Sequence, residues 1–113
     1  MITQQQLDGY LGKTIAAICQ NAYTSNADNH CAHFVSHVLG YQFGVTCKMM
    51  GNGLGTPANL RVQEIFPRCP SVGVWKLRPA PLVTCLVFIT RAANVNLAAR
   101  VMANVPRKHI GIY

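Results

Sequence analysis

Acidic residues are scarce in this chain of 113 residues, which carries only Asp8, Asp28 and Glu64. Against ten lysines and arginines they leave a formal net charge of +7 at pH 7. A surface of this kind attracts polyanions such as nucleic acids, anionic lipids and acidic cell-wall polymers. The basic residues form no dense block and no aromatic-interleaved motif, which argues against nucleic-acid binding as the main function.

Long hydrophobic runs are also lacking. No apolar run approaches the roughly 18 residues that a membrane-spanning helix needs, so we expect no membrane span. No secretory signal is visible, because the first residues are polar and the apolar run at 14–19 lacks a basic flank. We therefore expect a cytoplasmic protein or one exported by a non-classical route. Half of the residues are hydrophobic, which predicts a single globular domain over residues 1–113.

Cysteine pairs of the C-x-x-C kind are absent although the chain has five cysteines. This absence argues against zinc ribbons and thioredoxin-type redox sites. The odd count leaves at least one cysteine unpaired, and the missing secretory signal favours reduced thiols. Cys47 and Cys69 are a candidate disulfide that the sequence does not decide.

Hydrophobic periodicity predicts several helices. Residues 3–22 are expected to form one or two helical turns and then a helix, with Thr3 and Gln6 as a capping box. A short helix is expected to start at Thr56, with Thr56 as its N-cap and Pro57 in its first turn, and to end at Pro67. Residues 94–105 also have helical spacing. Residues 41–56 are rich in glycine, so we expect an irregular stretch there, and they contain no phosphate-binding pattern.

Two runs are typical of strands. Residues 82–90 are almost wholly apolar and β-branched, so we expect a central strand covered on both faces. Residues 108–113 form a shorter run that carries His109 near its beginning.

The stretch over residues 29–40 predicts a helix with a cysteine in its first turn. Apolar residues follow Cys31 at positions +3, +4, +7 and +8, which is one helical stripe, and Gly40 supplies the stop. Asn26 and Asp28 are the candidate N-caps. A thiol in the first turn faces the positive end of the helix, which favours the nucleophilic thiolate. If folding brings Cys31 to a histidine, the two form a nucleophile–base pair.

Three stretches of this chain resemble parts of the NlpC-type cell-wall cysteine peptidases. Residues 30–35, His-Cys-Ala-His-Phe-Val, resemble the family's Asp-Cys-Ser-Gly-Phe-Val motif, and residues 108–113, Lys-His-Ile-Gly-Ile-Tyr, resemble its His-Val-Gly-Ile-Tyr strand. Residues 86–89 are similar to the hydrophobic strand that lies between the two. In organisation the resemblance covers about residues 23–113.

The resemblance implies a papain-like α+β fold, with N-terminal helices and the nucleophile helix packed on a small antiparallel sheet. The implied activity is hydrolysis of an amide bond in peptidoglycan stem peptides. Cys31 would attack the carbonyl carbon, while His109 would take the thiol proton and return it to the leaving amine. The backbone N–H of Cys31 would help to stabilise the oxyanion.

The chain departs from the family motif around the cysteine. His30 stands in the place of the aspartate, and Ala32 and His33 stand in the places of the serine and glycine. We expect His30 and His33, with Tyr23 from the preceding loop, to contribute to substrate binding; the alternative for Tyr23 is an anchor between loop and core.

The family's histidine-orienting residue would follow Tyr113, where this chain stops, so we expect a truncated domain, an orienting group from elsewhere, or weak activity.

His33 and His37 have the i,i+4 spacing that can hold a metal ion. No glutamate accompanies them and no cysteine pair is near in sequence, so we expect exposed or hydrogen-bonded histidines, no metal and no cofactor.

Other function classes stay open. A related amidase or deamidase would use the same cysteine and histidine on another substrate. A non-catalytic binding domain would keep the fold without the activity. A nucleic-acid binder would show an affinity that falls steeply with salt.

Overall fold

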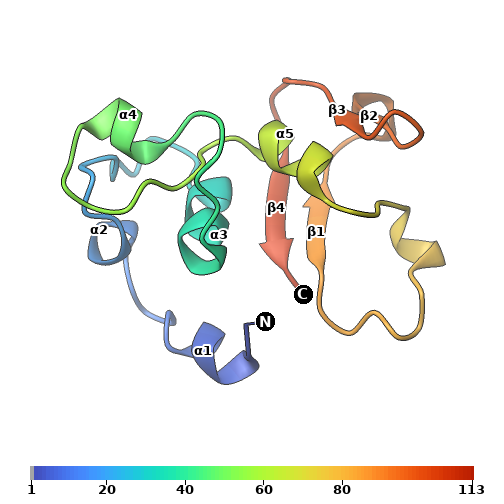
Figure 1. Ribbon diagram of the computed structural model, residues 1–113, viewed down its shortest axis with the longest axis horizontal. Helices are drawn as coiled ribbons and strands as arrows, with labels where there is room; N and C mark the ends of the chain where they lie inside the picture. The colour runs from blue at the N-terminus through green and yellow to red at the C-terminus, as the bar shows by residue number, and fades with distance from the viewer. Residues whose placement is uncertain (1) are drawn as a thin grey trace.

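The structure is a computed structural model that describes residues 2–113, and it has the predicted α+β composition. Its α-helices are α1 (Gln4–Asp8), α2 (Ile15–Ile18), α3 (Cys31–Leu39), α4 (Cys47–Gly51) and α5 (Val62–Ile65). Its strands are β1 (Leu86–Ile89), β2 (Val95–Asn96), β3 (Val101–Met102) and β4 (His109–Ile112), and its short 3-10 helices are η1 (Phe66–Arg68), η2 (Trp75–Leu77) and η3 (Ala92–Asn94). Helices α1 to α4 lie on one side and the strands on the other, with β4 between α3 and β1 (Figure 1). No helix within residues 2–113 combines the length and the apolar character needed to cross a bilayer.

The N-terminal capping box is confirmed. The N–H of Gln6 donates to Thr3 Oγ1 at 3.1 Å, and the N–H of Thr3 donates to Gln6 Oε1 at 2.8 Å. Helix α1 ends at Asp8, with Gly9 as its C-cap, and α2 begins after Thr14, whose side chain accepts from the N–H of Ala17. The predicted break between two helical segments is therefore present.

Helix α3 begins and ends as the sequence indicates, although its cap differs. Gly40 has φ +76° and closes the helix in the left-handed conformation that glycine adopts without strain. The predicted N-caps, Asn26 and Asp28, are wrong: the N-cap position belongs to His30, whose side chain makes no capping bond. The side chain of Asn29 accepts the N–H of Cys31 at 3.0 Å instead, because it lies only two residues away.

Strand β1 is shorter and more open than predicted. It pairs antiparallel with β4, with Leu86 opposite Ile112 and Ile89 opposite His109. Ile89 is 61% exposed, so the expectation of a central strand covered on both faces is wrong. The physical reason is that the sheet has two strands, and core packing covers one of its faces.

The helix predicted over residues 94–105 is also wrong. The segment forms the antiparallel pair β2 and β3, with Val95 opposite Met102. The side chain of Asn96 accepts the N–H of Ala99 at 2.9 Å, and Arg100 has φ +57°, so the chain turns where a helix would continue. Of the apolar positions that suggested a helix, Met102 is buried and Leu97 is exposed.

The helix predicted from Thr56 begins later. Residues 56–61 are not helical, and α5 has Arg61 at its N-cap position. Asn59 is held in a bridge to Thr46 instead, and its N–H donates to the carbonyl of Tyr41 at 2.9 Å. These long-range bonds outweigh the local capping preference of Thr56. Helix α4, which lies within the stretch expected to be irregular, was not predicted.

Within residues 2–113, the buried hydrophobic residues form two core clusters. The larger joins α3, α5 and the strands, and its buried members are Ala32, Val35, Val62, Ile65, Phe66, Met102 and Ile110. The smaller lies between α2, α4 and the segment before α5, and its buried members are Cys19, Cys47 and Ala58. The fully buried members of the second cluster are fewer and smaller than those of the first, so burial of hydrophobic groups stabilises this part of the chain less.

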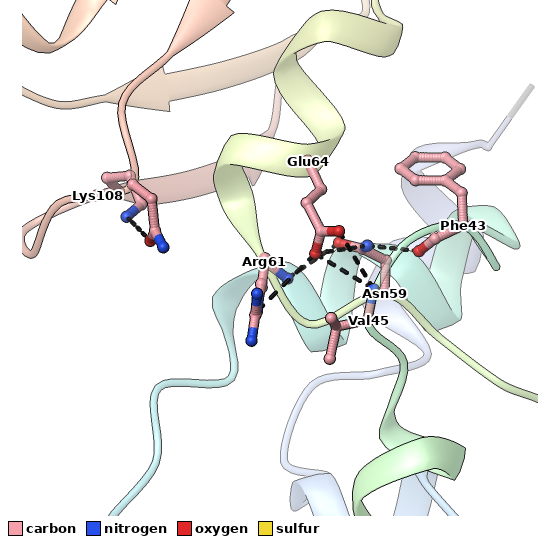
Figure 2. Close-up of polar contacts among 7 residues, drawn as sticks. Phe43, Val45, Asn59, Arg61, Glu64 and Lys108 are labelled. Carbon is pink, nitrogen blue, oxygen red and sulfur yellow. Dashed lines mark hydrogen bonds and ion pairs between the residues drawn. The ribbon is translucent and has the colours of Figure 1, made fainter.

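A hydrogen-bond network around the half-buried Glu64 connects the loop that follows α3 to the start of α5. Figure 2 shows the Glu64 carboxylate reaching from α5 toward Val45 and Asn59. The N–H of Val45 donates to both carboxylate oxygens, at 3.3 and 3.2 Å, and Asn59 Nδ2 donates to Phe43 O at 2.5 Å. The N–H of Arg61 donates to Asn59 Oδ1 at 3.0 Å. The network fixes the chain between α3 and α4 against the start of α5.

Replacing Glu64 by alanine should lower the free energy of unfolding by about 1–3 kcal/mol, because the N–H of Val45 would lose its acceptor. Urea denaturation of the purified chain measures the change. The matched control is Glu64→Gln, which keeps an acceptor oxygen and a similar shape and should cost about half as much or less. Equal losses in the two variants, or no loss in either, would show that the carboxylate does not hold this contact.

Candidate functional site

The predicted nucleophile and base each begin a secondary-structure element. Cys31 is the first residue of α3 and is half-buried against the larger core cluster, whereas His109 is the first residue of β4 and is exposed. Helix α3 packs against β4, so the two elements are neighbours (Figure 1). No hydrogen bond joins Cys31 Sγ to the His109 ring, both of which lie within the described part of the chain.

The direction of His109 follows from the alternation of side chains along β4. Ile110 is buried in the core cluster that also contains Ala32 and Val35 of α3. Successive strand residues point to opposite faces, so His109 points away from the face that carries Ile110. The structure therefore brings the two elements together without joining the two reactive groups.

The expected oxyanion donor already has an acceptor. The N–H of Cys31 donates to Asn29 Oδ1 at 3.0 Å. This N–H would become available to a substrate oxyanion when the Asn29 side chain turned aside.

The three residues predicted to bind substrate lie together. Tyr23 and His30 are half-buried, with ring centroids 5.7 Å apart in an edge-to-face arrangement. Tyr23 meets His33 in a similar way at 5.6 Å. His33 has no exposed surface, so its burial gives no support to a direct role in substrate binding. Tyr23 and His30 retain surface that a ligand can reach.

A line of histidines runs from the surface loop into the interior. His30 Nε2 lies 2.7 Å from the carbonyl oxygen of Ser25, and His30 Nδ1 lies 3.0 Å from His33 Nδ1. His33 Nε2 lies 3.1 Å from His37 Nε2, which lies 3.7 Å from Cys47 Sγ. The prediction of hydrogen-bonded histidines is confirmed for all three rings.

The line ends in a cluster of two cysteines and two histidines. The ligand atoms of Cys19, His33, His37 and Cys47 all lie within 4.8 Å of one another. Cys19 follows α2, the histidines belong to α3, and Cys47 begins α4. The sequence has no cysteine pair near these histidines, but folding brings Cys19 and Cys47 to them, so the expectation of no metal loses its basis. The i,i+4 histidine spacing was the one signal in the sequence that pointed to this place.

Asn21 supports the cluster from one side. It is fully buried, its N–H donates to Cys19 Sγ at 3.4 Å, and its Nδ2 donates to Cys47 Sγ at 3.1 Å. Nδ2 also donates to Thr56 O at 2.8 Å, and Oδ1 accepts the N–H of Gly55 at 2.8 Å. Both sulfur atoms thus accept hydrogen bonds from a single residue that is itself held on several sides.

Burial sets the protonation states inside the cluster. Burial, together with the neighbouring His37 and His30, lowers the pKa of His33 to about 4. Burial also lowers the pKa of His37. The pKa of the Cys19 thiol is raised, mainly by burial and also by Cys47. His33 and His37 are therefore neutral at pH 7, and the Cys19 thiol keeps its proton when no cation is near.

All five cysteines are free. The candidate disulfide between Cys47 and Cys69 is not formed, because Cys47 lies in the cluster and Cys69 Sγ donates to the carbonyl of Ile65 at 3.8 Å.

No protein-family model, curated protein or solved structure matches this chain. Its function is therefore inferred from the positions and chemistry of its own residues.

Proposed function

We propose that this chain is a papain-like cysteine hydrolase that cleaves an amide bond in peptidoglycan stem peptides, with Cys31 as nucleophile and His109 as base. The proposal is supported by one observation above all: a half-buried cysteine begins a helix that packs against the strand that begins with a histidine. The similarity of residues 30–35 and 108–113 to the NlpC-type motifs gives the substrate class.

The chemistry would proceed through a thioester. Cys31 Sγ attacks the carbonyl carbon of the amide, and its proton passes to His109. When the carbon–nitrogen bond breaks, His109 gives this proton to the leaving amine, and the acyl group stays on Cys31. Water, deprotonated by His109, then hydrolyses the thioester and frees the thiol. Because His109 points away from the face of β4 on which α3 packs, this chemistry requires a rearrangement at the start of β4 that carries the ring to Cys31 Sγ.

The charge of the chain is compatible with this substrate. A net charge of +7 would draw the protein to the anionic polymers of a cell wall, and the attraction would weaken as salt is added. Tyr23 and His30, which keep exposed surface before the nucleophile, are the residues proposed to contact the peptide.

Alkylation by iodoacetamide near pH 7 should be fastest at Cys31, by about tenfold or more over Cys85. The proposed base would take the proton of the Cys31 thiol and leave the nucleophilic thiolate, whereas no histidine is proposed to act on Cys85. His109→Ala should reduce the Cys31 rate to that of Cys85. Peptide mass spectrometry after timed exposure measures every site in one sample.

The other thiols act as internal references. Cys19 is buried, and burial raises the pKa of both Cys19 and Cys69, so both should react slowly. Lys108→Ala is the matched control for His109→Ala, because it removes a neighbouring charge and keeps the imidazole. Equal rates at Cys31 and Cys85 in the unaltered protein would rule out an activated nucleophile.

One observation favours the alternative of a non-catalytic binding domain with the same fold: Cys31 and His109 share no hydrogen bond within residues 2–113. Such a domain would bind wall fragments without changing them. It predicts ordinary reactivity at Cys31 together with saturable binding of soluble peptidoglycan fragments, so the same alkylation experiment separates the two functions.

A further inference from the structure

We propose that Cys19, His33, His37 and Cys47 bind one Zn²⁺ ion in a closed, tetrahedral, structural site. Two thiolates and two imidazoles are a donor set that zinc prefers, and four protein ligands are typical of structural zinc. This site is separate from the proposed catalytic pair, which contributes none of the four ligands.

The distances within the cluster are close to those of a tetrahedral site. With Zn–N bonds of about 2.0–2.1 Å and Zn–S bonds of about 2.3 Å, two nitrogens lie about 3.3 Å apart and nitrogen and sulfur about 3.6 Å apart. The nitrogens of His33 and His37 are 3.1 Å apart, and His37 Nε2 is 3.7 Å from Cys47 Sγ. Two sulfurs would be about 3.8 Å apart, and the widest spacing in the cluster stays within 4.8 Å. Adjustments of about 1 Å or less in side-chain positions would complete the site.

The hydrogen bonds around the cluster orient its ligands. When the rings are neutral, the Nε2–H of His30 donates to the carbonyl of Ser25, so His30 Nδ1 carries no proton. His30 Nδ1 must then be the acceptor in its contact with His33, and His33 Nδ1–H the donor. His33 Nε2 then carries a lone pair on the side of the ring toward the cluster, where His37 Nε2 lies 3.1 Å away. Metal-bound histidines usually donate their second ring N–H in this manner.

The thiol ligands have matching support. Asn21 donates its backbone N–H to Cys19 Sγ and its side-chain N–H to Cys47 Sγ. Donors aimed at sulfur stabilise thiolates, which are the form that binds metal. Asn21 itself is immobilised by Thr56 and Gly55, so these donors are in position before an ion arrives.

Charge balance also favours a divalent cation here. Cys19, His33 and Cys47 are buried, and two buried thiolates without a counter-charge would be very costly. An ion of charge +2 would neutralise the two thiolates, and neutral histidine ligands would add no further charge. His37 borders a surface hollow of about 280 Å³, together with Ser36 and Gly40, which offers a route for the ion.

Burial argues against two other uses of the cluster. Cys47 and His37 lie 3.7 Å apart, yet Cys47 has no exposed surface and no substrate carbonyl could reach its sulfur. A catalytic metal site would keep one coordination position open, whereas here four protein groups surround the same point. A structural ion would join α2, α3 and α4 around the smaller core cluster, where fewer hydrophobic residues are fully buried than in the larger one.

The experiment uses the full chain, purified under reducing conditions without chelators. We expect about one zinc per chain by elemental mass spectrometry. The zinc-free protein titrated with Co²⁺ should develop thiolate-to-metal charge-transfer absorption and the intense visible bands of a tetrahedral site. Zinc contents far below one per chain, together with a Co²⁺ spectrum of weak octahedral type, would overturn the proposal.

Variants identify the ligands. Cys47→Ala and His37→Ala should each weaken zinc binding by about 100-fold or more, and Asn21→Ala by about tenfold. Cys85→Ala, which removes a thiol outside the cluster, should leave the affinity unchanged. If a ligand variant fails to fold, the stoichiometry and Co²⁺ spectrum of the unaltered protein still decide.

A disulfide between Cys19 and Cys47 is the competing explanation. It would lower the intact mass by about two hydrogens and abolish Co²⁺ binding until a reductant is added. Finding this bond in protein kept under reducing conditions would also overturn the zinc site.

Discussion

Replacing Cys31 by serine should reduce the hydrolysis of peptidoglycan stem peptides by about 10³-fold or more, because no other group can form the thioester. The hydroxyl of serine is far less acidic than a thiol, and His109 would have to activate it without a hydrogen bond already in place. Liquid chromatography with mass spectrometry, following the appearance of the new amine, measures the rate.

The matched control is Cys85→Ser, which also removes a half-buried thiol and should keep the full rate. A Cys31→Ser variant that retains more than about a tenth of the activity would show that another group is the nucleophile. Zinc content should be the same in both variants, because neither cysteine belongs to the proposed zinc site. Loss of activity with loss of zinc would therefore indicate misfolding and not a missing nucleophile.

Replacing Gly53 by alanine should lower the free energy of unfolding by about 3 kcal/mol. A Cβ at this position would lie 2.8 Å from the carbonyl carbon of Asn21 and would also overlap its Cα. Backbone cannot rotate out of the way as a side chain can, so the loop would have to move. Because Asn21 contacts Cys19 and Cys47, the shift would also disturb the cysteine–histidine cluster.

Gly73→Ala provides the matched control, since a Cβ there meets no atom within 4 Å. Its stability should stay within about 0.5 kcal/mol of the unaltered chain. Urea denaturation of the two variants side by side makes the comparison. Equal stability would mean that the loop before Thr56 does not pack on Asn21 as the structure has it.

The elements predicted correctly are those whose ends depend on near neighbours. Thr3 and Gln6 form the expected capping box, and Gly40 closes α3 in the expected left-handed conformation. These interactions span a few residues, so a short stretch of sequence contains both partners. The α+β composition, which the resemblance to the NlpC-type peptidases implied, is also present.

The elements predicted wrongly are those where a distant partner or a side-chain turn outweighs periodicity. Thr56 does not start a helix because Asn59 is bonded to Tyr41 and bridged to Thr46. The helix expected over residues 94–105 is a hairpin because the side chain of Asn96 closes a turn. Apolar residues at these spacings suit either structure, and the sequence offers no means to choose.

For the candidate sites, local sequence was sufficient to find a cysteine that begins a helix and a histidine that begins a strand. Folding in three dimensions alone brings Cys19 and Cys47 to His33 and His37, and turns His109 away from the core face of β4. The reason is physical: a cap or a hydrophobic stripe is a short-range property of the chain. The meeting of residues 10 or more positions apart depends on loop paths and packing that no local pattern encodes.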